Sequence, residues 1–323
     1  MTPSVNQVHV NTPLTNISVA YIQEDSHFIA GKVFPEIPVD KKSDLFFKYK
    51  KEDWFRDEAK PRADGTESAG SGYGLSQDNY TCDVDAFHKD VGDQTRANAD
   101  NPLSPDRDAT NFVSQRLLLR REKQFVNSYF KTGVWGTDKA GGASGGGGDF
   151  TYFSDFVNSD PTTVVDDGKE LILQTTGFEA NTLVLAYKVF NKLKRHPVVR
   201  DQYKYTSAES ITADMIAKVF DLERVLVAKA VENTANEGAV ASMNFVHGTN
   251  MLLCHVAKNP GVLVPSAGYT FAWKGVSGGL NKTVGVTRFR MPQLKADRIE
   301  GEQAFDLKVI GADLGVFYSN AIL

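Results

Sequence analysis

The stretch RDEAKPRADGTESAGSGYG, residues 56–74, is a long polar segment between two segments that alternate apolar and polar residues. It contains no aliphatic residue larger than alanine and carries charges of both signs. One face of the preceding segment holds Leu45, Phe47 and Tyr49, and one face of the following segment holds Tyr80, Cys82, Val84 and Ala86. Alternation with a period of two indicates half-buried strands. The sequence therefore predicts a hairpin formed by residues 45–50 and 80–88, with a polar finger at its end.

A hairpin of this length needs support at its outer end. At about 3.3 Å per residue its arms would reach roughly 40 Å, and an isolated two-stranded ribbon is only marginally stable. We therefore expect the outer half to rest on something outside its own subunit. Ion pairs between identical copies fix register by rejecting like-charge mismatches, whereas exposed pairs within one chain contribute little. The candidate contact residues of the finger are Arg56, Asp57, Glu58, Lys60, Arg62, Asp64 and Glu67.

The strongest helix signal covers residues 106–131. Asp106 and Asp108 suit the positive N-terminal end of a helix, and Gly133 marks its stop. A broad apolar band is formed by Phe112, Val113, Leu117, Leu118, Phe125, Val126, Tyr129 and Phe130. The charged side chains expected to face away from this band are Arg116, Arg120, Arg121 and Glu122. The pattern predicts a long amphipathic helix that packs on a sheet.

Helices and strands alternate beyond residue 160, which indicates an α+β lobe with a small sheet. Helices are expected at 163–175, 188–195 and 212–220, the last of them capped by Thr212. Strands are expected at 182–186, 224–231, 251–256, 305–310 and 315–318. Nearer the start, Pro35 and Pro38 predict that 28–39 is an edge strand or an extended segment, because proline lacks the donor that a central strand needs.

The composition argues against several classes of function. The 323 residues carry a net charge of −4, which disfavours a dedicated nucleic-acid binder. No apolar run is long enough to cross a bilayer. The sequence has no metal-spaced cysteine motif, phosphate-binding lysine loop or nucleophile elbow, and its six histidines are scattered. We therefore predict a protein that is not an enzyme and that uses no cofactor and no metal.

Several longer segments carry a resemblance to a known family. They are FIAGKVFPEIPVDKKSDLFFKYKKEDWFRDEAKPRADGTESAGSGYGLSQDNYTCDVDAFHKDVGDQTRANADNP at 28–102, DRDATNFVSQRLLLRREKQFVNSYFKTGVWG at 106–136, NTLVLAYKVFNKLKRHP at 181–197, LERVLVAKAVENTA at 222–235 and PSAGYTFAWKG at 265–275. In this order they resemble the major capsid proteins of tailed bacteriophages with the Hong Kong 97-type fold. The resemblance runs from about residue 19 to the C-terminus.

This resemblance implies an α+β subunit with five named parts. They are an N-terminal arm at 1–43, an extended β-hairpin called the E-loop at 44–90, a peripheral domain at 91–158 that contains the spine helix 106–131, an axial domain at 159–275, and returning peripheral-domain strands with the C-terminal segment at 276–323. The finger then becomes the tip of the E-loop, and its expected partner becomes the next copy of the same chain.

The resemblance also implies a function. Identical subunits would self-assemble into hexamers and pentamers of an icosahedral shell that encloses double-stranded phage DNA and contacts it non-specifically. A portal protein, a cement protein and a separate scaffolding protein are the further expected partners, and no membrane is expected. The scaffold is expected to be separate because the resemblance begins almost at Met1. Assembly would take place in the host cytoplasm, and the protein would reside in the virion capsid.

Three alternatives stay open. An encapsulin-type bacterial nanocompartment shell would have the same fold but would load an enzyme cargo. An enzyme with an unrecognised site in the α+β lobe would be a soluble monomer that a ligand stabilises. A tail or adhesin component would form filaments or trimers rather than shells.

Overall fold

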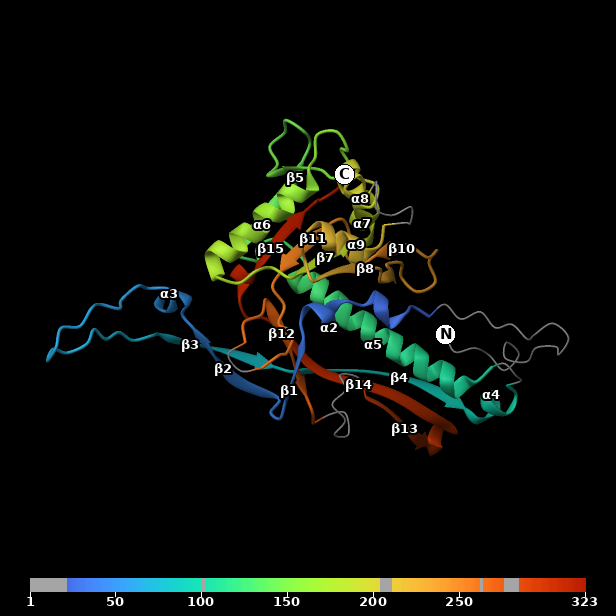
Figure 1. Cartoon of the computed structure of the whole chain (residues 1–323). Helices are drawn as coiled ribbons and strands as arrows, with labels where there is room; N and C mark the ends of the chain where they lie inside the picture. The colour runs from blue at the N-terminus through green and yellow to red at the C-terminus, as the bar shows by residue number, and fades with distance from the viewer. Residues whose placement is uncertain (1–21, 100–102, 204–210, 262–263, 276–284) are drawn as a thin grey trace.

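The chain forms two main sheets with covering helices and one long two-stranded ribbon (Figure 1). A computed structural model of the protein describes residues 22–99, 103–203, 211–261, 264–275 and 285–323. In Figure 1 the ribbon extends to the left, one sheet and its helices form the upper lobe, and the other sheet runs along the lower right. Across these described ranges, no helix combines the length and the apolar character that a membrane span requires.

The lower sheet is built around the long strand β14. Its strands are β1 (Glu36–Val39), β12 (Gly268–Trp273), β14 (Ala296–Val309), β13 (Gly285–Met291) and β4 (Asp83–Gly92). Strand β14 pairs antiparallel with β4, β12 and β13, while β1 runs parallel to β12 at an edge. The short elements around this sheet are η2 (Asp25–His27), α2 (Ala30–Val33), α4 (Asp93–Ala97) and η3 (Pro292–Leu294).

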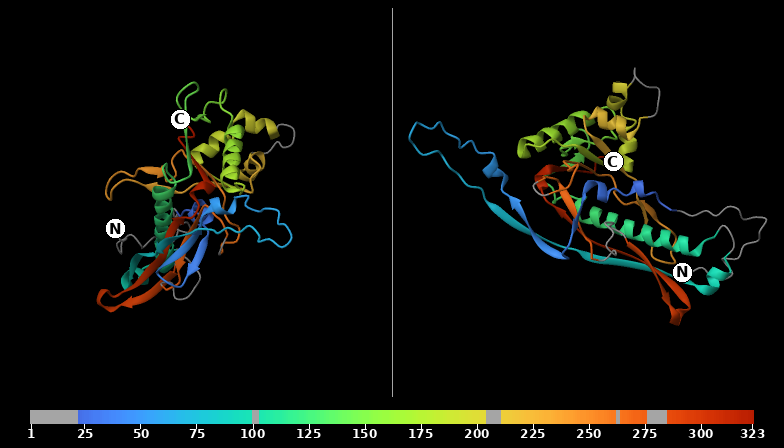
Figure 2. Two further views of the ribbon diagram at one scale, coloured as in Figure 1. Left: turned by 90° about the vertical axis from the view of Figure 1, so that its left-hand side faces the viewer. Right: turned by 60° about the horizontal axis from the view of Figure 1, so that its bottom comes forward.

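Helix α5 (Pro105–Tyr129) lies along this lower sheet, as the right-hand view of Figure 2 shows. Val113 and Leu117 of the helix pack over Gly301 of β14. A Cβ atom at Gly301 would lie 2.6 Å from Val113 Cγ1 and 2.7 Å from Leu117 Cδ1. Glycine at this position therefore lets the helix approach the strand closely.

The upper sheet has six strands, and its helices form the rest of the upper lobe. The strand order is β6 (Phe150–Thr151), β5 (Thr137–Gly142), β15 (Gly315–Ser319), β11 (Met251–Cys254), β7 (Thr182–Ala186) and β8 (Arg224–Ala228). The helices are α6 (Pro161–Thr176), α7 (Tyr187–Leu193), α8 (Pro197–Tyr203), α9 (Ala213–Val219) and the short η4 (Ala312–Leu314). A small hairpin, β9 (Val231–Asn233) with β10 (Met243–Phe245), follows β8.

Strands of the upper sheet supply side chains to two cores, one on each face. Leu183 and Leu185 of β7 belong to the core beneath the upper helices. Val184, between them, belongs to the core that contains Phe34 and Phe125, on the side of α2 and α5. Successive side chains of a strand point to opposite faces, so a strand covered on both faces is apolar throughout. The same buried sheet therefore joins the two lobes.

The ribbon has a different second strand from that of the predicted hairpin. Strand β2 (Ser43–Tyr49) pairs antiparallel with β3 (Leu75–Thr81), from Ser43 opposite Thr81 to Tyr49 opposite Leu75. The prediction that residues 80–88 pair with 45–50 is wrong, because after Thr81 the chain continues as β4 and pairs with β14. Unbroken alternation through this region predicts strand structure but does not identify the partner strand. The short helix α3 (Lys51–Trp54) follows β2.

Most other elements lie where the sequence predicts them. Helix α5 agrees with the predicted 106–131, β7 matches 182–186, and Thr212 caps α9 by accepting a hydrogen bond from the Met215 N–H. The two sheets do not follow the predicted segment boundaries, because β5 and β6 join the upper sheet and β12 joins the lower one. Within the predicted arm 1–43, residues 1–21 lie outside the described residues, and 22–39 contain η2, α2 and the edge strand β1.

Candidate functional site: the ribbon, the arm anchor and an ion network

The tip of the ribbon is fully open to solvent. All seven charged residues named above for the finger are exposed. Arg56 lies 3.5 Å from the mostly buried Asp53 and 3.9 Å from the exposed Glu58. No other described part of the chain lies over the tip in the views of Figures 1 and 2. A contact between this tip and another copy stays a prediction.

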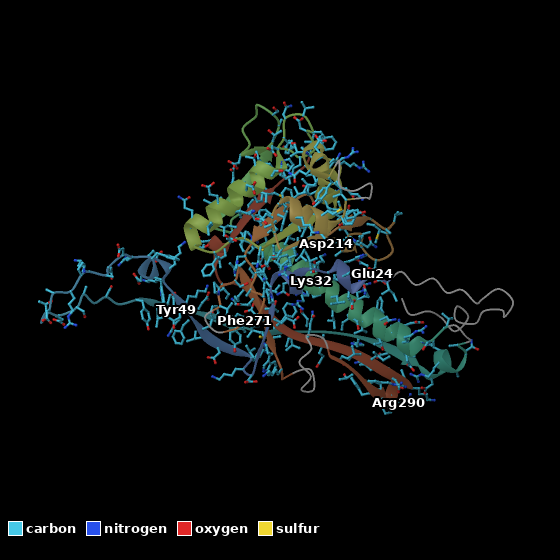
Figure 3. All side chains as sticks on the ribbon, viewed as in Figure 1. Glu24, Lys32, Tyr49, Asp214, Phe271 and Arg290 are labelled. Carbon is cyan, nitrogen blue, oxygen red and sulfur yellow. The ribbon has the colours of Figure 1, made fainter. Side chains whose placement is uncertain are left out.

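One face of the ribbon carries six exposed apolar side chains, which we call the apolar face, with the polar Gln77 and Asn79 opposite Phe47 and Leu45 on the same face. It consists of Leu45, Phe47, Tyr49, Trp54, Tyr73 and Leu75, each more than 40% exposed. Phe47 and Trp54 are 61% and 63% exposed. The opposite face packs on the lower sheet, where the rings of Phe46 and Tyr80 lie 5.3 and 4.6 Å from the ring of Phe271 (labelled in Figure 3). The ribbon is therefore partly covered by the lower sheet on one face and uncovered on the other.

The outer part of the apolar face is ordered by local contacts. The rings of Tyr49, Trp54 and Tyr73 lie 5.7 to 6.0 Å from one another. An oxygen of Asp53 accepts a hydrogen bond from the Gly74 N–H at 2.8 Å, which holds the start of β3 against α3. Exposed apolar patches of this kind mark interaction surfaces. The alternation at 45–49 predicted one apolar face. The sequence pattern indicated that this face is half-buried, and the contact with a neighbouring copy was predicted at the charged tip instead.

Contacts with the upper lobe fix the direction of the ribbon. Lys51 of α3 forms an ion pair with Asp313 in η4. The ring of Phe55 packs against Gly177 at the end of α6, and its Cζ lies 3.2 Å from the position that a Cβ of Gly177 would occupy. Because Gly177 has a positive φ of 72°, a conformation that glycine adopts without steric cost, the residue both ends the helix and leaves room for the ring.

Two of the four candidate charges on α5 lie on its surface as predicted. The guanidinium of Arg116 lies 5.0 Å from the centre of the half-exposed Phe112 ring. Arg120 Nε is 3.4 Å from a carboxylate oxygen of Asp85 on β4. Both side chains are exposed. They remain available for contact with a neighbour, which is still a prediction.

The prediction that Arg121 and Glu122 face away from the apolar band is wrong, because the arm covers them. Arg121 is 7% exposed and Glu122 is 0% exposed. Arg121 Nη1 donates to Glu36 of β1 at 2.6 Å, and its Nη2 donates to Thr270 Oγ1 of β12 at 3.4 Å. A helical pattern cannot show that another segment packs on the polar side of the helix. Arg121 therefore ties the arm and the lower sheet to α5.

Glu122 holds the backbone of the arm directly. Its carboxylate accepts hydrogen bonds from the N–H groups of Ile29 at 3.0 and 3.1 Å and of Ala30 at 3.0 Å. His247, in the turn after β10, places its Nε2 at 3.2 Å from Glu122 Oε1. Burial raises the pKa of Glu122 to about 7 and lowers the pKa of His247 to about 3. His247 is therefore neutral at neutral pH, and we call this contact set the arm anchor.

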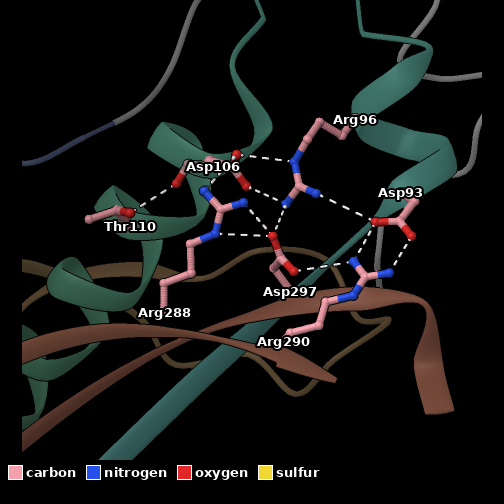
Figure 4. Close-up of polar contacts among 7 residues, drawn as sticks. All are labelled: Asp93, Arg96, Asp106, Thr110, Arg288, Arg290 and Asp297. Atoms are coloured by element: carbon pink, nitrogen blue, oxygen red, sulfur yellow. Dashed lines mark hydrogen bonds and ion pairs between the residues drawn. The ribbon is translucent and has the colours of Figure 1, made fainter. Parts of the chain in front are cut away.

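A network of ion pairs lies at the end of the lower sheet that is next to α4 (Figure 4). Its members are Asp93, Arg96, Asp106, Arg288, Arg290 and Asp297. Arg96 Nη2 lies 2.8 Å from Asp106 and 3.1 Å from Asp297, and Arg290 Nη2 lies 2.6 Å from Asp93. Together these side chains connect α4, the start of α5, β13 and β14. Several charges acting together fix geometry better than one exposed pair does.

Acid should loosen this network. Hydrogen bonds from Arg290 to Asp93 and from Arg288 to Asp297 hold the pKa of each carboxyl below its usual 3.8. Their stabilising contribution is therefore present above the unfolded value and is lost as the pH falls through the lower folded value. We expect Asp297→Asn to reduce the dependence of the thermal unfolding midpoint on pH between about 5 and 2. Parallel acid profiles for the variant and the wild type would contradict this account.

No metal centre emerges from the described ranges, since they contain no group of three or more His, Cys, Asp or Glu side chains that could hold an ion. The two thiols are also poorly placed for catalysis. Burial raises the pKa of Cys82 to about 11 and that of Cys254 to about 12. A thiol acts as a nucleophile only when it is deprotonated, so neither is activated at neutral pH.

Comparisons with known proteins agree with this geometry. No family model matches the chain. The "Major capsid protein" of Burkholderia phage BcepMu is 25% identical over 326 residues, which cover 96% of this chain and 96% of that protein. The crystal structure of a phage-related protein from Bordetella bronchiseptica RB50 is 25% identical and superposes with a TM-score of 0.69, over 93% of this chain and 94% of that one.

A third comparison concerns the fold alone. The capsid structure of cyanophage P-SCSP1u superposes with a TM-score of 0.61 at 11% identity, over 98% of this chain and 94% of that one. This likeness shows that the two chains share a fold. The chain is similar along nearly its whole length to a phage major capsid protein, and its fold is the Hong Kong 97-type fold of phage capsids.

Proposed function

We propose that the chain is a major capsid protein, whose identical subunits assemble into the hexamers and pentamers of an icosahedral shell around double-stranded phage DNA. The observation that carries the proposal is the ribbon. One of its faces is anchored to the subunit, while the apolar face and the charged tip are uncovered. The similarity to a phage major capsid protein over 96% of the chain supports the same reading.

The geometry of the ribbon favours a head-to-tail contact between neighbouring copies. The apolar face lies on a protrusion, so a second copy meets it with a different part of its surface. Such contacts form closed rings when the rotation between copies closes. In this proposal the apolar face supplies most of the free energy, because burial of apolar area is the main driving force of association. The charged tip then sets the register between copies.

The named parts of the subunit follow from the same proposal. The E-loop at 44–90 contains the ribbon, the arm at 1–43 contains α2 and β1, and the peripheral domain at 91–158 contains α5 as its spine helix. The axial domain at 159–275 contains most of the upper lobe, and 276–323 returns through β13 and β14. The axial domains would meet at the centre of each capsomer.

The remaining partners also belong to this proposal. They are a separate scaffolding protein, a portal protein, a cement protein and packaged DNA contacted non-specifically, with assembly in the host cytoplasm and residence in the virion. Two features support a structural rather than an enzymatic role, namely the protonated buried thiols and the similarity to a capsid protein. The same similarity favours a phage shell over an encapsulin-type compartment.

Deleting residues 60–72 should leave the subunit folded and prevent shell assembly. These residues are exposed and make no contact with the core, so the fold does not depend on them. We expect the circular dichroism spectrum and the thermal midpoint to match the wild type, and negative-stain micrographs to show shells for the wild type only. Loss of folding would place the tip in the core. A wild type that stays monomeric under assembly conditions would contradict the proposed function itself.

A further inference from the structure

A polar recess lies where the arm meets the lower end of the upper sheet. It has a volume of about 220 Å³ and is lined by parts of α2, by Asn181 before β7, by the start of β8 and by the residues after β11. Lys32, which is labelled in Figure 3, belongs to α2 and lines the recess. A water molecule occupies about 30 Å³ in the liquid, so the recess has room for a small polyatomic group. It is distinct from the apolar face and from the ion network.

Arg224, at the start of β8, is held rigidly in this recess. Its Nε donates to Thr182 Oγ1 at 2.9 Å, and its Nη2 donates to the Lys32 carbonyl oxygen at 3.0 Å. A guanidinium carries five N–H donors, so these two bonds fix its plane and leave further donors free. Within the described part of the chain, no carboxylate lies within ion-pair distance of Arg224. A fixed, unpaired guanidinium is pre-organised to bind a planar or tetrahedral oxyanion.

The other charges of the recess are also mostly positive. Lys32 and Lys258 line it together with Arg224, and Glu223 is the one acidic residue in the lining. Lys258 Nζ is 2.6 Å from Glu223 Oε1. The Lys32 ammonium donates a hydrogen bond to the Ser26 carbonyl oxygen at 3.4 Å. Three cations against one anion leave a local positive charge in a chain whose net charge is −4.

We propose that this recess is an oxyanion site that binds a phosphate group. Arg224 would supply directed hydrogen bonds, and Lys32 and Lys258 would add positive charge from two sides. A bound phosphate would connect α2 of the arm with β8 of the upper sheet. The inference rests on the recess alone and does not depend on the capsid proposal. The group could arrive as the free ion or as part of a DNA strand, and the test separates these sources.

The test is a titration of the full-length protein with inorganic phosphate at constant ionic strength. Isothermal titration calorimetry measures the affinity. Two substitutions should move the affinity in opposite directions, which misfolding cannot imitate. Lys258→Gln should weaken binding by on the order of five-fold, the effect of losing one partly exposed charge. Glu223→Gln should tighten binding by a similar factor, because it frees Lys258 and removes a repulsive carboxylate. Lys229→Gln, an exposed lysine outside the recess, should have no effect.

The outcomes either overturn the proposal or identify the source of the phosphate group. The absence of any phosphate-dependent heat, or equal affinities for all four proteins, would overturn the proposal. Competition between phosphate and a short DNA duplex, weakened by Lys258→Gln but not by Lys229→Gln, would support it with DNA as the source. Phosphate binding that follows the predicted order without competition from DNA would support it with the free ion as the source.

Discussion

Replacing Phe47 by glutamate should abolish shell assembly while the subunit stays folded. Phe47 lies in the middle of the apolar face and is 61% exposed, so the isolated subunit loses little packing. In the assembled shell its ring would be buried against a neighbour, and an unpaired carboxylate there would cost several kcal/mol. Because every copy of the chain would carry the same substitution, shell assembly should be lost completely. Sedimentation velocity should show wild-type shells and a variant that remains in small species.

The matched control is Phe47→Leu, which keeps an apolar side chain at the same position. It should assemble, with at most a modest reduction in shell yield. Far-ultraviolet circular dichroism of both variants should match the wild type, since Phe47 lies on the uncovered face of the ribbon. Normal shells from Phe47→Glu would show that the apolar face is not an inter-subunit surface.

Replacing Glu122 by alanine should destabilise the subunit by about 3 kcal/mol, because it leaves buried N–H groups of Ile29 and Ala30 without an acceptor. The substitution also opens a cavity beside His247, which adds to the cost. Urea unfolding measures the change best in the Phe47→Glu background, where assembly adds no stability. A loss below about 1 kcal/mol would contradict the proposed role of Glu122 in holding the arm.

Glu122→Gln is the control, because an amide oxygen can still accept the two arm N–H groups. It should cost clearly less than alanine, and it should also change the pH dependence. The folded-state pKa of Glu122 is about 7 and its ordinary value is 4.5, so folding takes up a proton between these values. That contribution is present at low pH and is lost as the pH rises through about 7. Glutamine does not titrate, so the variant should lose this slope.

Local patterns in the sequence predicted the regular elements well. The apolar band and the glycine stop located α5, the apolar run of 183–186 located β7, and Thr212 located the start of α9. Each of these signals lies in the element that it predicts or close to one of its ends. The family resemblance supplied the expected order of the parts, which stays a prediction, and the resemblance itself is confirmed by the similarity to a phage major capsid protein.

Two errors arose where tertiary contacts override local pattern. Arg121 and Glu122 are charged residues that normally face solvent, but the arm packs over them and uses them as hydrogen-bond partners. The alternation that covers 80–88 runs from the ribbon into the lower sheet, and only the three-dimensional structure shows that the partner changes near Cys82. Neither feature has a signal in the neighbouring sequence.

The apolar face was predicted only in part from the sequence. The alternation of Leu45, Phe47 and Tyr49 was visible in the sequence, and the structure shows which face of the ribbon the subunit covers. The face with Phe46 and Tyr80 packs against Phe271, and the other face has no cover from the described part of its own chain. We therefore expect the main inter-subunit contact at the apolar face rather than at the charged tip.

Cryo-electron microscopy of assembled particles at side-chain resolution tests the central claim most directly. The account predicts closed icosahedral shells of hexamers and pentamers in which a neighbouring copy of the chain buries Phe47 and Trp54. Particles in which the apolar face remains open to solvent, or a protein that stays a stable monomer under assembly conditions, would contradict it.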